Sequence, residues 1–129
     1  MPKIPRQQME THNKEDRKRN FNEVAIGYSL ETALKEAERC LQCKTPLCQE
    51  GCPVNIEIKE FIAHLKNKDF EGASEAIKRS STLPAVCGRV CPQEKQCEAK
   101  CVLAKKGKPV AIGNLERFVG DLDREKNNE

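Results

Sequence analysis

Eight cysteines are the residues of this 129-residue chain that could carry chemistry, and they fall into two sequence motifs of four. The N-terminal motif has the spacing C-x2-C-x4-C-x3-C-P and consists of Cys40, Cys43, Cys48 and Cys52. The C-terminal motif has the spacing C-x3-C-P-x4-C-x3-C and consists of Cys87, Cys91, Cys97 and Cys101. Eight thiols can form disulfides or bind metal, and the redox state of the compartment decides between the two.

The N-terminal sequence favours a reducing compartment. Residues 1–20 are polar and contain no apolar run that could form the core of a signal peptide. No later stretch approaches the roughly 20 apolar residues of a membrane span. We therefore expect a cytoplasmic protein without a membrane partner, in which an even number of cysteines indicates metal binding and not cystine.

Two kinds of metal site compete for these thiols. A 4Fe-4S cluster takes three thiolates from one tight loop and the fourth from elsewhere, and in bacterial ferredoxins the cysteine before a proline ligates the other cluster. Cys52, which precedes Pro53, is therefore expected to join ligands from the C-terminal motif. Structural zinc sites pair two C-x2-C-like knuckles that are a dozen or more residues apart, whereas here four cysteines crowd together. The sequence favours two 4Fe-4S clusters, with a zinc-stabilised protein-interaction module as the alternative.

Composition agrees with a domain that metal holds together. Only 37% of the residues are hydrophobic and 4% are aromatic, so the apolar core is thin for one domain. The 23 basic and 20 acidic residues are mixed along the chain, so the sequence shows no strongly basic segment that would indicate nucleic-acid binding. None of the seven glycines forms a G-x-G step, so the dinucleotide fingerprint is missing, and no catalytic constellation stands out. The chain alone is not expected to be catalytic.

Helical periodicity dominates the rest of the chain, which predicts an all-α class. Ser29 should cap a helix that runs to Leu41, and Asn55 and Asp69 should cap the next two helices. The cysteines are expected on irregular loops at residues 44–54 and 86–92 and on a short helix that ends at Gly107. In the second loop Gly88 is expected to supply backbone freedom. A last helix is expected from Ile112 to Leu122.

Several ordered motifs resemble one family. They are RNFNEV at residues 19–24, AERCLQC at 37–43, PLCQEGCPV at 46–54, GRVCP at 88–92 and PVAIGNLERF at 109–118. Together they are similar to the N-terminal iron-sulfur domain of the NADPH-dependent glutamate synthase small (beta) subunit. The same domain type occurs in dihydropyrimidine dehydrogenase and in the large subunit of NADH-dependent ferredoxin:NADP oxidoreductase, or sulfide dehydrogenase. The resemblance covers residues 19–123.

This resemblance implies a small helical domain, of the alpha-helical ferredoxin kind, with two 4Fe-4S clusters over residues 19–123. Residues 1–18 would be a polar arm, and residues 124–129 a tail or a linker to FAD- and NAD(P)H-binding domains. The chain would relay electrons between FAD and a partner such as the large glutamate synthase subunit. FAD and NADPH would bind to those further domains or to a partner.

The resemblance also implies a ligand set. In dihydropyrimidine dehydrogenase-like domains one cluster has a non-cysteine ligand from the segment that is similar to residues 113–118, which places Glu116 in that role. One cluster would then use Cys40, Cys43, Cys48 and Glu116, and the other Cys52, Cys91, Cys97 and Cys101. Cys87 would be a spare cysteine or the alternative to Glu116. Arg89 and Arg117 could tune the clusters, and a helix-surface position is the alternative for Arg117.

Overall fold

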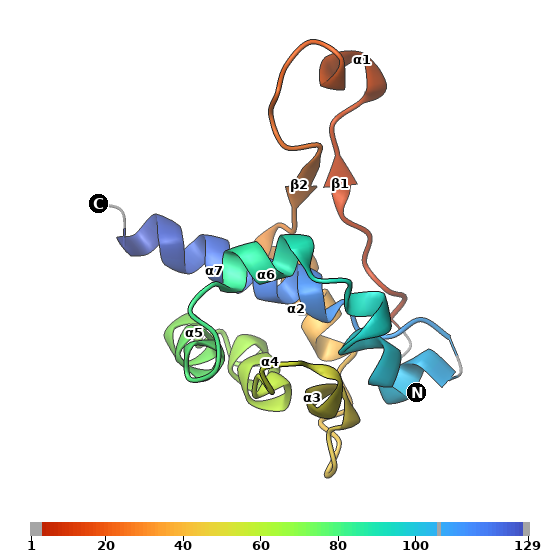
Figure 1. The fold of residues 1–129 in the computed structure, drawn as a ribbon, viewed down its shortest axis with the longest axis vertical. Coiled ribbons are helices and arrows are strands. Elements are labelled where there is room, and N and C mark those ends of the chain that lie inside the picture. Colours follow the sequence, from red (N-terminus) through yellow and green to blue (C-terminus); the bar gives the residue numbers. More distant parts are fainter. Residues whose placement is uncertain (1–3, 106, 128–129) are drawn as a thin grey trace.

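The chain is mostly helical in residues 4–105 and 107–127, which are the residues that the computed structural model describes (Figure 1). The α-helices are α1 (Lys14–Arg17), α2 (Leu30–Glu38), α3 (Leu47–Gly51), α4 (Ile58–Lys66), α5 (Phe70–Lys78), α6 (Pro84–Val90) and α7 (Ile112–Asn127). Three short 3-10 segments follow α6, namely η1 (Gln93–Lys95), η2 (Glu98–Lys100) and η3 (Val102–Lys105). The helical class is confirmed. Over these residues no helix combines the length and the apolar character needed to cross a membrane.

A short hairpin was not predicted. Strand β1 (Glu10–Thr11) pairs antiparallel with β2 (Ala25–Gly27), and the hairpin projects from the helical body with α1 at its tip (Figure 1). Strands of two and three residues are too short to show an alternating pattern in the sequence. The residues from Thr11 to Val24 are exposed, so this part of the expected polar arm is solvated.

The core forms where the apolar stripes of the helices meet. Helix α4 packs against α5, α5 packs against α7, and α2 contacts both α4 and α7. The largest fully buried apolar side chains come from these helices, and they are Phe61, Ile62, Leu65, Ile77, Leu115 and Val119. The stripes expected for these helices are therefore the faces that pack.

Helix α6 lies very close to α7, and Gly88 permits this approach. A Cβ atom at Gly88 would lie 2.5 Å from the backbone nitrogen of Arg117. Residues 84–90 form a helix and not the expected loop, so the prediction that Gly88 supplies loop freedom is wrong. Its missing side chain instead lets two helix backbones pack closely.

Some element boundaries agree with the sequence and others do not. The side chains of Ser29 and Asp69 accept hydrogen bonds from the first turns of α2 and α5, as predicted. Asn55 does not cap α4: its φ is +52°, in the left-handed region that Asn tolerates, and Glu57 precedes the helix instead. The predicted loop at 44–54 contains α3, and the predicted helix with Cys97 and Cys101 is replaced by the 3-10 segments.

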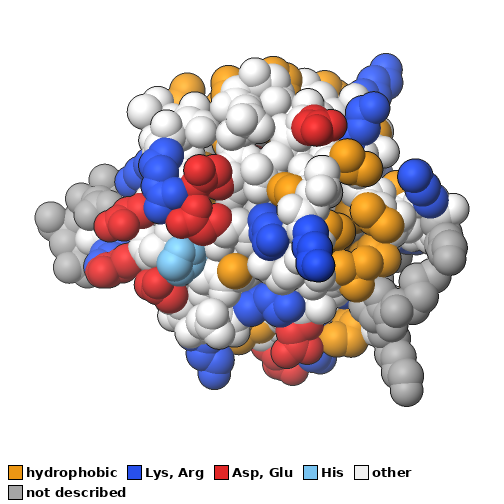
Figure 2. Space-filling view, turned by 90° about the horizontal axis from the view of Figure 1, so that it is seen from below, with side chains coloured by type: hydrophobic (Ala, Val, Ile, Leu, Met, Phe, Trp, Pro, Cys, Tyr) orange, Lys and Arg blue, Asp and Glu red, His pale blue; other side chains and the backbone are white. Residues whose placement is uncertain are grey.

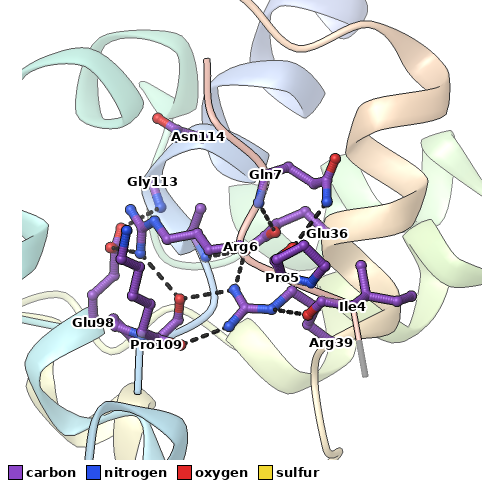
Figure 3. A network of polar contacts seen from close by, with 12 residues as sticks. Ile4, Pro5, Arg6, Gln7, Glu36, Arg39, Glu98, Pro109, Gly113 and Asn114 are labelled. Atoms are coloured by element: carbon purple, nitrogen blue, oxygen red, sulfur yellow. Dashed lines mark hydrogen bonds and ion pairs between the residues drawn. The ribbon is translucent and has the colours of Figure 1, made fainter. Parts of the chain in front are cut away.

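A buried ion pair ties the start of the chain to its later segments (Figure 3). Glu36 is fully buried and accepts hydrogen bonds from Arg39, from the backbone of Gln7 and from the backbone of Ala111. Arg39 also donates to the carbonyl oxygens of Ile4, Lys108 and Pro109. The expected polar arm is therefore fixed to the body at residues 4–7. This network joins α2 to the segment that leads into α7.

Candidate metal centre

Four thiols line one pocket near α3. The pocket contains Cys40, Cys43 and Cys48 from the first half of the chain and Cys101 from the second half. Cys40 follows the end of α2, Cys48 lies on α3, and Cys101 lies between η2 and η3. Apolar side chains of α4 and of the segments around Cys101 complete the lining, among them Ile58, Ile62, Leu103 and Val110. We call these four thiols the first group from here on.

Burial and neighbouring thiols raise the pKa values of two thiols of the first group, Cys48 and Cys40. Burial raises the pKa of the Cys48 thiol to about 12, and the neighbouring thiols of Cys40 and Cys101 add to this effect. Burial also raises the pKa of Cys40. The amide of Gln42 donates a hydrogen bond to the Cys40 sulfur at 3.3 Å and another to the Lys59 carbonyl at 3.2 Å. A bound cation would reverse this balance, because metals bind the thiolate form.

A second set of donors gathers between the end of α3, the segments from α6 to η2, and α7. Burial raises the pKa of Cys97 to about 12, and the charges of Glu98, Glu116 and Cys52 act in the same direction. Burial raises the pKa of Cys91 to about 11, with contributions from Cys87, Glu116 and Cys52. Cys52 and Glu116 thus lie near enough to act on both Cys91 and Cys97, and we call these four residues the second group.

Glu116 has the features of a metal ligand. The side chain is buried on α7, and its Oε1 atom has no hydrogen-bond partner within the described part of the chain. Burial raises the pKa of this carboxyl to about 7. A buried carboxylate without a partner is costly, and a bound cation would offset that cost. A donor set of thiolates with one carboxylate fits an iron-sulfur cluster.

Cys87 lies close to the second group. It sits within α6, and its sulfur lies 3.8 Å from the Ser81 hydroxyl. The Cys87 thiol also contributes to the raised pKa of Cys91, so the two sulfurs are near one another. Cys87 therefore stands beside the second group as a fifth possible donor.

The two groups differ from the ligand sets that the resemblance implies. Cys52 and Glu116 lie near Cys91 and Cys97, and Cys101 lines the pocket of the first group. Helix α3 packs against η2 and against a residue between η1 and η2: a Cβ at Gly51 would lie 2.5 Å from the Gln96 carbonyl oxygen. Within the ranges 4–105 and 107–127 no three His, Cys, Asp or Glu side chains are already arranged around one metal-ion position. The cysteines are all free thiols.

Arg89 and Arg117 are held in an ion-pair network beside the second group. Arg89 donates two hydrogen bonds of 2.8 Å to the carboxylate of Asp121 and also contacts Glu23. Arg117 is buried, donates to the Ala25 carbonyl at 2.9 Å and pairs with Glu23 at 3.3 Å. The alternative of Arg117 as a helix-surface charge is wrong, because the hairpin covers it.

Sequence reasoning missed two polar residues that position these groups. Gln42, with a φ of +54°, connects Cys40 to α4. Glu98 is buried between two cysteines and accepts hydrogen bonds from Arg6 and from the backbone of Gly113. Their position between cysteines of one motif is the signal that could have identified them.

Comparison with known proteins identifies an iron-sulfur domain family. The family profile described as dihydropyrimidine dehydrogenase domain II, 4Fe-4S cluster, matches residues 17–128. The chain is 38% identical over 105 residues to the NAD-dependent dihydropyrimidine dehydrogenase subunit PreT of Escherichia coli, an alignment that covers 81% of this chain and 26% of PreT. It is 39% identical over 105 residues to the glutamate synthase (NADPH) small chain of E. coli, covering 81% of this chain and 22% of the relative.

A third relative is the putative oxidoreductase AegA of E. coli, 36% identical over 108 residues, with 83% of this chain and 16% of AegA covered. The chain thus spans about a quarter or less of the length of these relatives. The resemblance seen in the cysteine motifs is confirmed. The chain belongs to the family of the dihydropyrimidine dehydrogenase domain II, the iron-sulfur domain shared by these oxidoreductases.

Proposed function

We propose that this chain holds two 4Fe-4S clusters and relays single electrons within a flavin- and NAD(P)H-dependent oxidoreductase. The observation that carries the proposal is the gathering of free thiols from distant segments into two groups, one of which includes a buried carboxylate without a partner. An iron-sulfur family and an electron-transfer role agree with the comparisons. The number of clusters and the identity of their ligands are our proposal.

The ligand sets that the geometry supports best interlock the two halves of the chain. Cys40, Cys43, Cys48 and Cys101 would hold one cluster, and Cys52, Cys91, Cys97 and Glu116 would hold the other. When bound, a 4Fe-4S cluster supplies one-electron redox chemistry at a potential set by its ligands and surroundings. A carboxylate is a harder iron ligand than a thiolate, so the corner bound by Glu116 should be the most labile.

The protein's own residues would shield and tune these sites. The apolar walls of the first group, from α4 and from Leu103, keep water away from the sulfurs. The amide of Gln42 donates to the Cys40 sulfur, and hydrogen bonds to ligand sulfurs shift the potential of a cluster. On the second group, Glu98 fixes the backbone of Gly113 at the start of α7 and so positions Glu116 three residues later.

FAD and a nicotinamide cofactor would bind outside this chain. The relatives extend far beyond the region that this chain matches, and they include both an NAD-dependent and an NADPH-dependent protein. We propose that this domain serves an enzyme of the glutamate synthase small-subunit type, with NADPH and FAD on further domains or a partner. A cytoplasmic location is part of the proposal, since thiolate-bound clusters need a reducing compartment.

Metal and sulfide analysis after anaerobic purification tests the proposal. We expect about eight irons and about eight sulfides per chain, with a broad visible absorbance. Colourless protein that carries zinc after native expression would instead support the zinc-stabilised interaction module. NADPH oxidation by this chain alone would contradict the role as a relay that depends on other domains.

Substitutions at Glu116 and Cys87 test the carboxylate ligand. We expect Glu116→Ala to disturb one cluster, seen as iron loss and a changed EPR signal, while Cys87→Ser leaves both clusters intact. Glu125→Ala is the matched control, because Glu125 lies on the same helix and is exposed. The reverse result, with Cys87→Ser losing iron and Glu116→Ala keeping it, would make Cys87 the ligand.

A further inference from the structure

Four lysines surround the first group without neutralising carboxylates. Lys59 and Lys100 line the pocket, Lys44 lies in the loop between Cys43 and Cys48, and the Lys66 ammonium donates to the carbonyl oxygen of Cys40 at 3.4 Å. Within the described residues none of the four lysines forms an ion pair, whereas four lysines elsewhere do: Lys18, Lys35, Lys78 and Lys126. These four unpaired lysines therefore form a cationic cluster at this site.

Carboxylates on the same segments do not offset this charge. Glu57 and Glu60 of the adjoining helix are paired with Arg79. Glu98 is buried and paired with Arg6, so it does not face solvent here. Glu50 on α3 is exposed and is the remaining carboxylate on α3 and α4 without an ion pair among the described residues. The local balance stays positive.

The centre of this cationic face is apolar. Leu41 and Val102 line the same pocket and are 48% and 40% exposed. Figure 2 views the molecule from the end where α3 lies, and it shows hydrophobic side chains gathered beside Lys and Arg, with most Asp and Glu side chains on the other side. An apolar centre with a charged rim is the usual composition of a protein interface.

We propose that this face, defined by Leu41, Val102, Lys44, Lys59, Lys66 and Lys100, docks the acidic surface of a small electron-carrier protein. The proposal rests on the proposed function, because a carrier must approach the first group to exchange an electron with it. Four unpaired ammonium groups would attract carboxylates and speed the encounter, and the apolar centre would exclude water once the partner has docked.

A protein partner fits this face better than an anionic polymer or membrane. Recognition of single-stranded nucleic acid uses aromatic side chains for stacking, and no aromatic residue is among those that line the pocket. Membrane insertion needs a wide apolar face, whereas Leu41 and Val102 are the pocket-lining hydrophobic residues that are strongly exposed.

Binding of the cluster-loaded chain to a flavodoxin of net negative charge tests the proposal. We expect binding at low ionic strength that weakens at least about fivefold between about 20 and 200 mM salt, because rim charges are screened. The variant Lys44→Gln, Lys59→Gln, Lys66→Gln, Lys100→Gln should bind at least about tenfold more weakly. Basic cytochrome c should not bind measurably to the unaltered chain.

The matched control carries Lys18→Gln, Lys35→Gln, Lys78→Gln and Lys126→Gln, which change the net charge equally. We expect this control to weaken flavodoxin binding less than about twofold, since these lysines are already paired. Equal losses in both variants, or no flavodoxin binding at low salt, would overturn the proposal. Tighter binding through the same lysines to anionic phospholipid vesicles or single-stranded DNA would also overturn it.

Iron and sulfide content separates this proposal from the proposed function. A chain that holds both clusters but fails the flavodoxin test contradicts only the docking face. A chain that holds no cluster contradicts the proposed function, whatever it binds.

Discussion

The cationic side chains beside the two donor groups differ in whether they form ion pairs. Beside the first group, Lys44, Lys59 and Lys100 have no ion-pair partner among the described residues. Beside the second group, Arg89 and Arg117 are both bonded to the carboxylates of α7 and of the hairpin. The cationic side chains beside the second group therefore form ion pairs within the molecule, whereas those beside the first group remain available to a partner.

Packing shows the same contrast. The first group lies in a pocket between short segments, with exposed apolar residues at its edge. The second group lies against α7, which α5, α6 and α2 all contact. The difference fits the proposal that the first group faces a partner outside the domain, while the second lies among packed helices.

Removal of the clusters should have the largest effect and should affect the two regions most. After oxidation and chelation we expect the segments at 40–52 and 87–105 to lose hydrogen-exchange protection, because short 3-10 turns and loops cannot hold buried thiols apart by themselves. Helices α4 and α5, which share the core around Phe61 and Ile77, should lose less. An unchanged cooperative unfolding transition after removal would contradict this dependence on metal.

The next effect is the loss of half of the iron, and it tests which group Cys101 joins. We expect Cys101→Ala and Cys48→Ala, alone or combined, to lose the same four or so of about eight irons. Combined with Cys97→Ala, the Cys101→Ala substitution should lose all of about eight. Iron analysis of the anaerobic variants measures this directly. The opposite pattern would restore the division expected from the sequence, with Cys101 in the second group.

This question remained open because sequence patterns predict helices better than contacts between them. The apolar stripes of α4, α5 and α7 depend on neighbours in the chain, and these were predicted correctly. The placement of Cys101 in the pocket with Cys40, Cys43 and Cys48 is a matter of tertiary packing between segments far apart in the chain. Likewise, the sequence marks Arg117 as a charge, but only the hairpin at Ala25 shows that it is buried.

A third test breaks the connection between the two regions. Glu36 joins α2, which leads to the first group, with Ala111, which leads into α7. Glu36→Gln leaves the Arg39 guanidinium buried without a counter-charge, which should cost about 3–5 kcal/mol in the free energy of unfolding. Anaerobic urea denaturation followed by circular dichroism measures this. On the exposed side of the same helix, Glu31→Gln should change the free energy by less than about 0.5 kcal/mol, and similar values for both variants would argue against a structural ion pair.

The smallest effect should be confined to the second group. Gly88→Ala adds a methyl group that would lie 2.5 Å from the backbone of Arg117, so α6 and α7 must separate. Overpacking of this kind costs about 1–3 kcal/mol. Because Cys91 directly follows α6 and Glu116 lies on α7, the separation should alter the EPR signal of the cluster in the second group and leave that of the first unchanged. Gly107→Ala is the control, since a Cβ there meets no atom within 4 Å. Equal changes in both signals would mean that the two groups share one packing unit, and the contrast drawn between a partner-facing region and a built-in region would no longer hold.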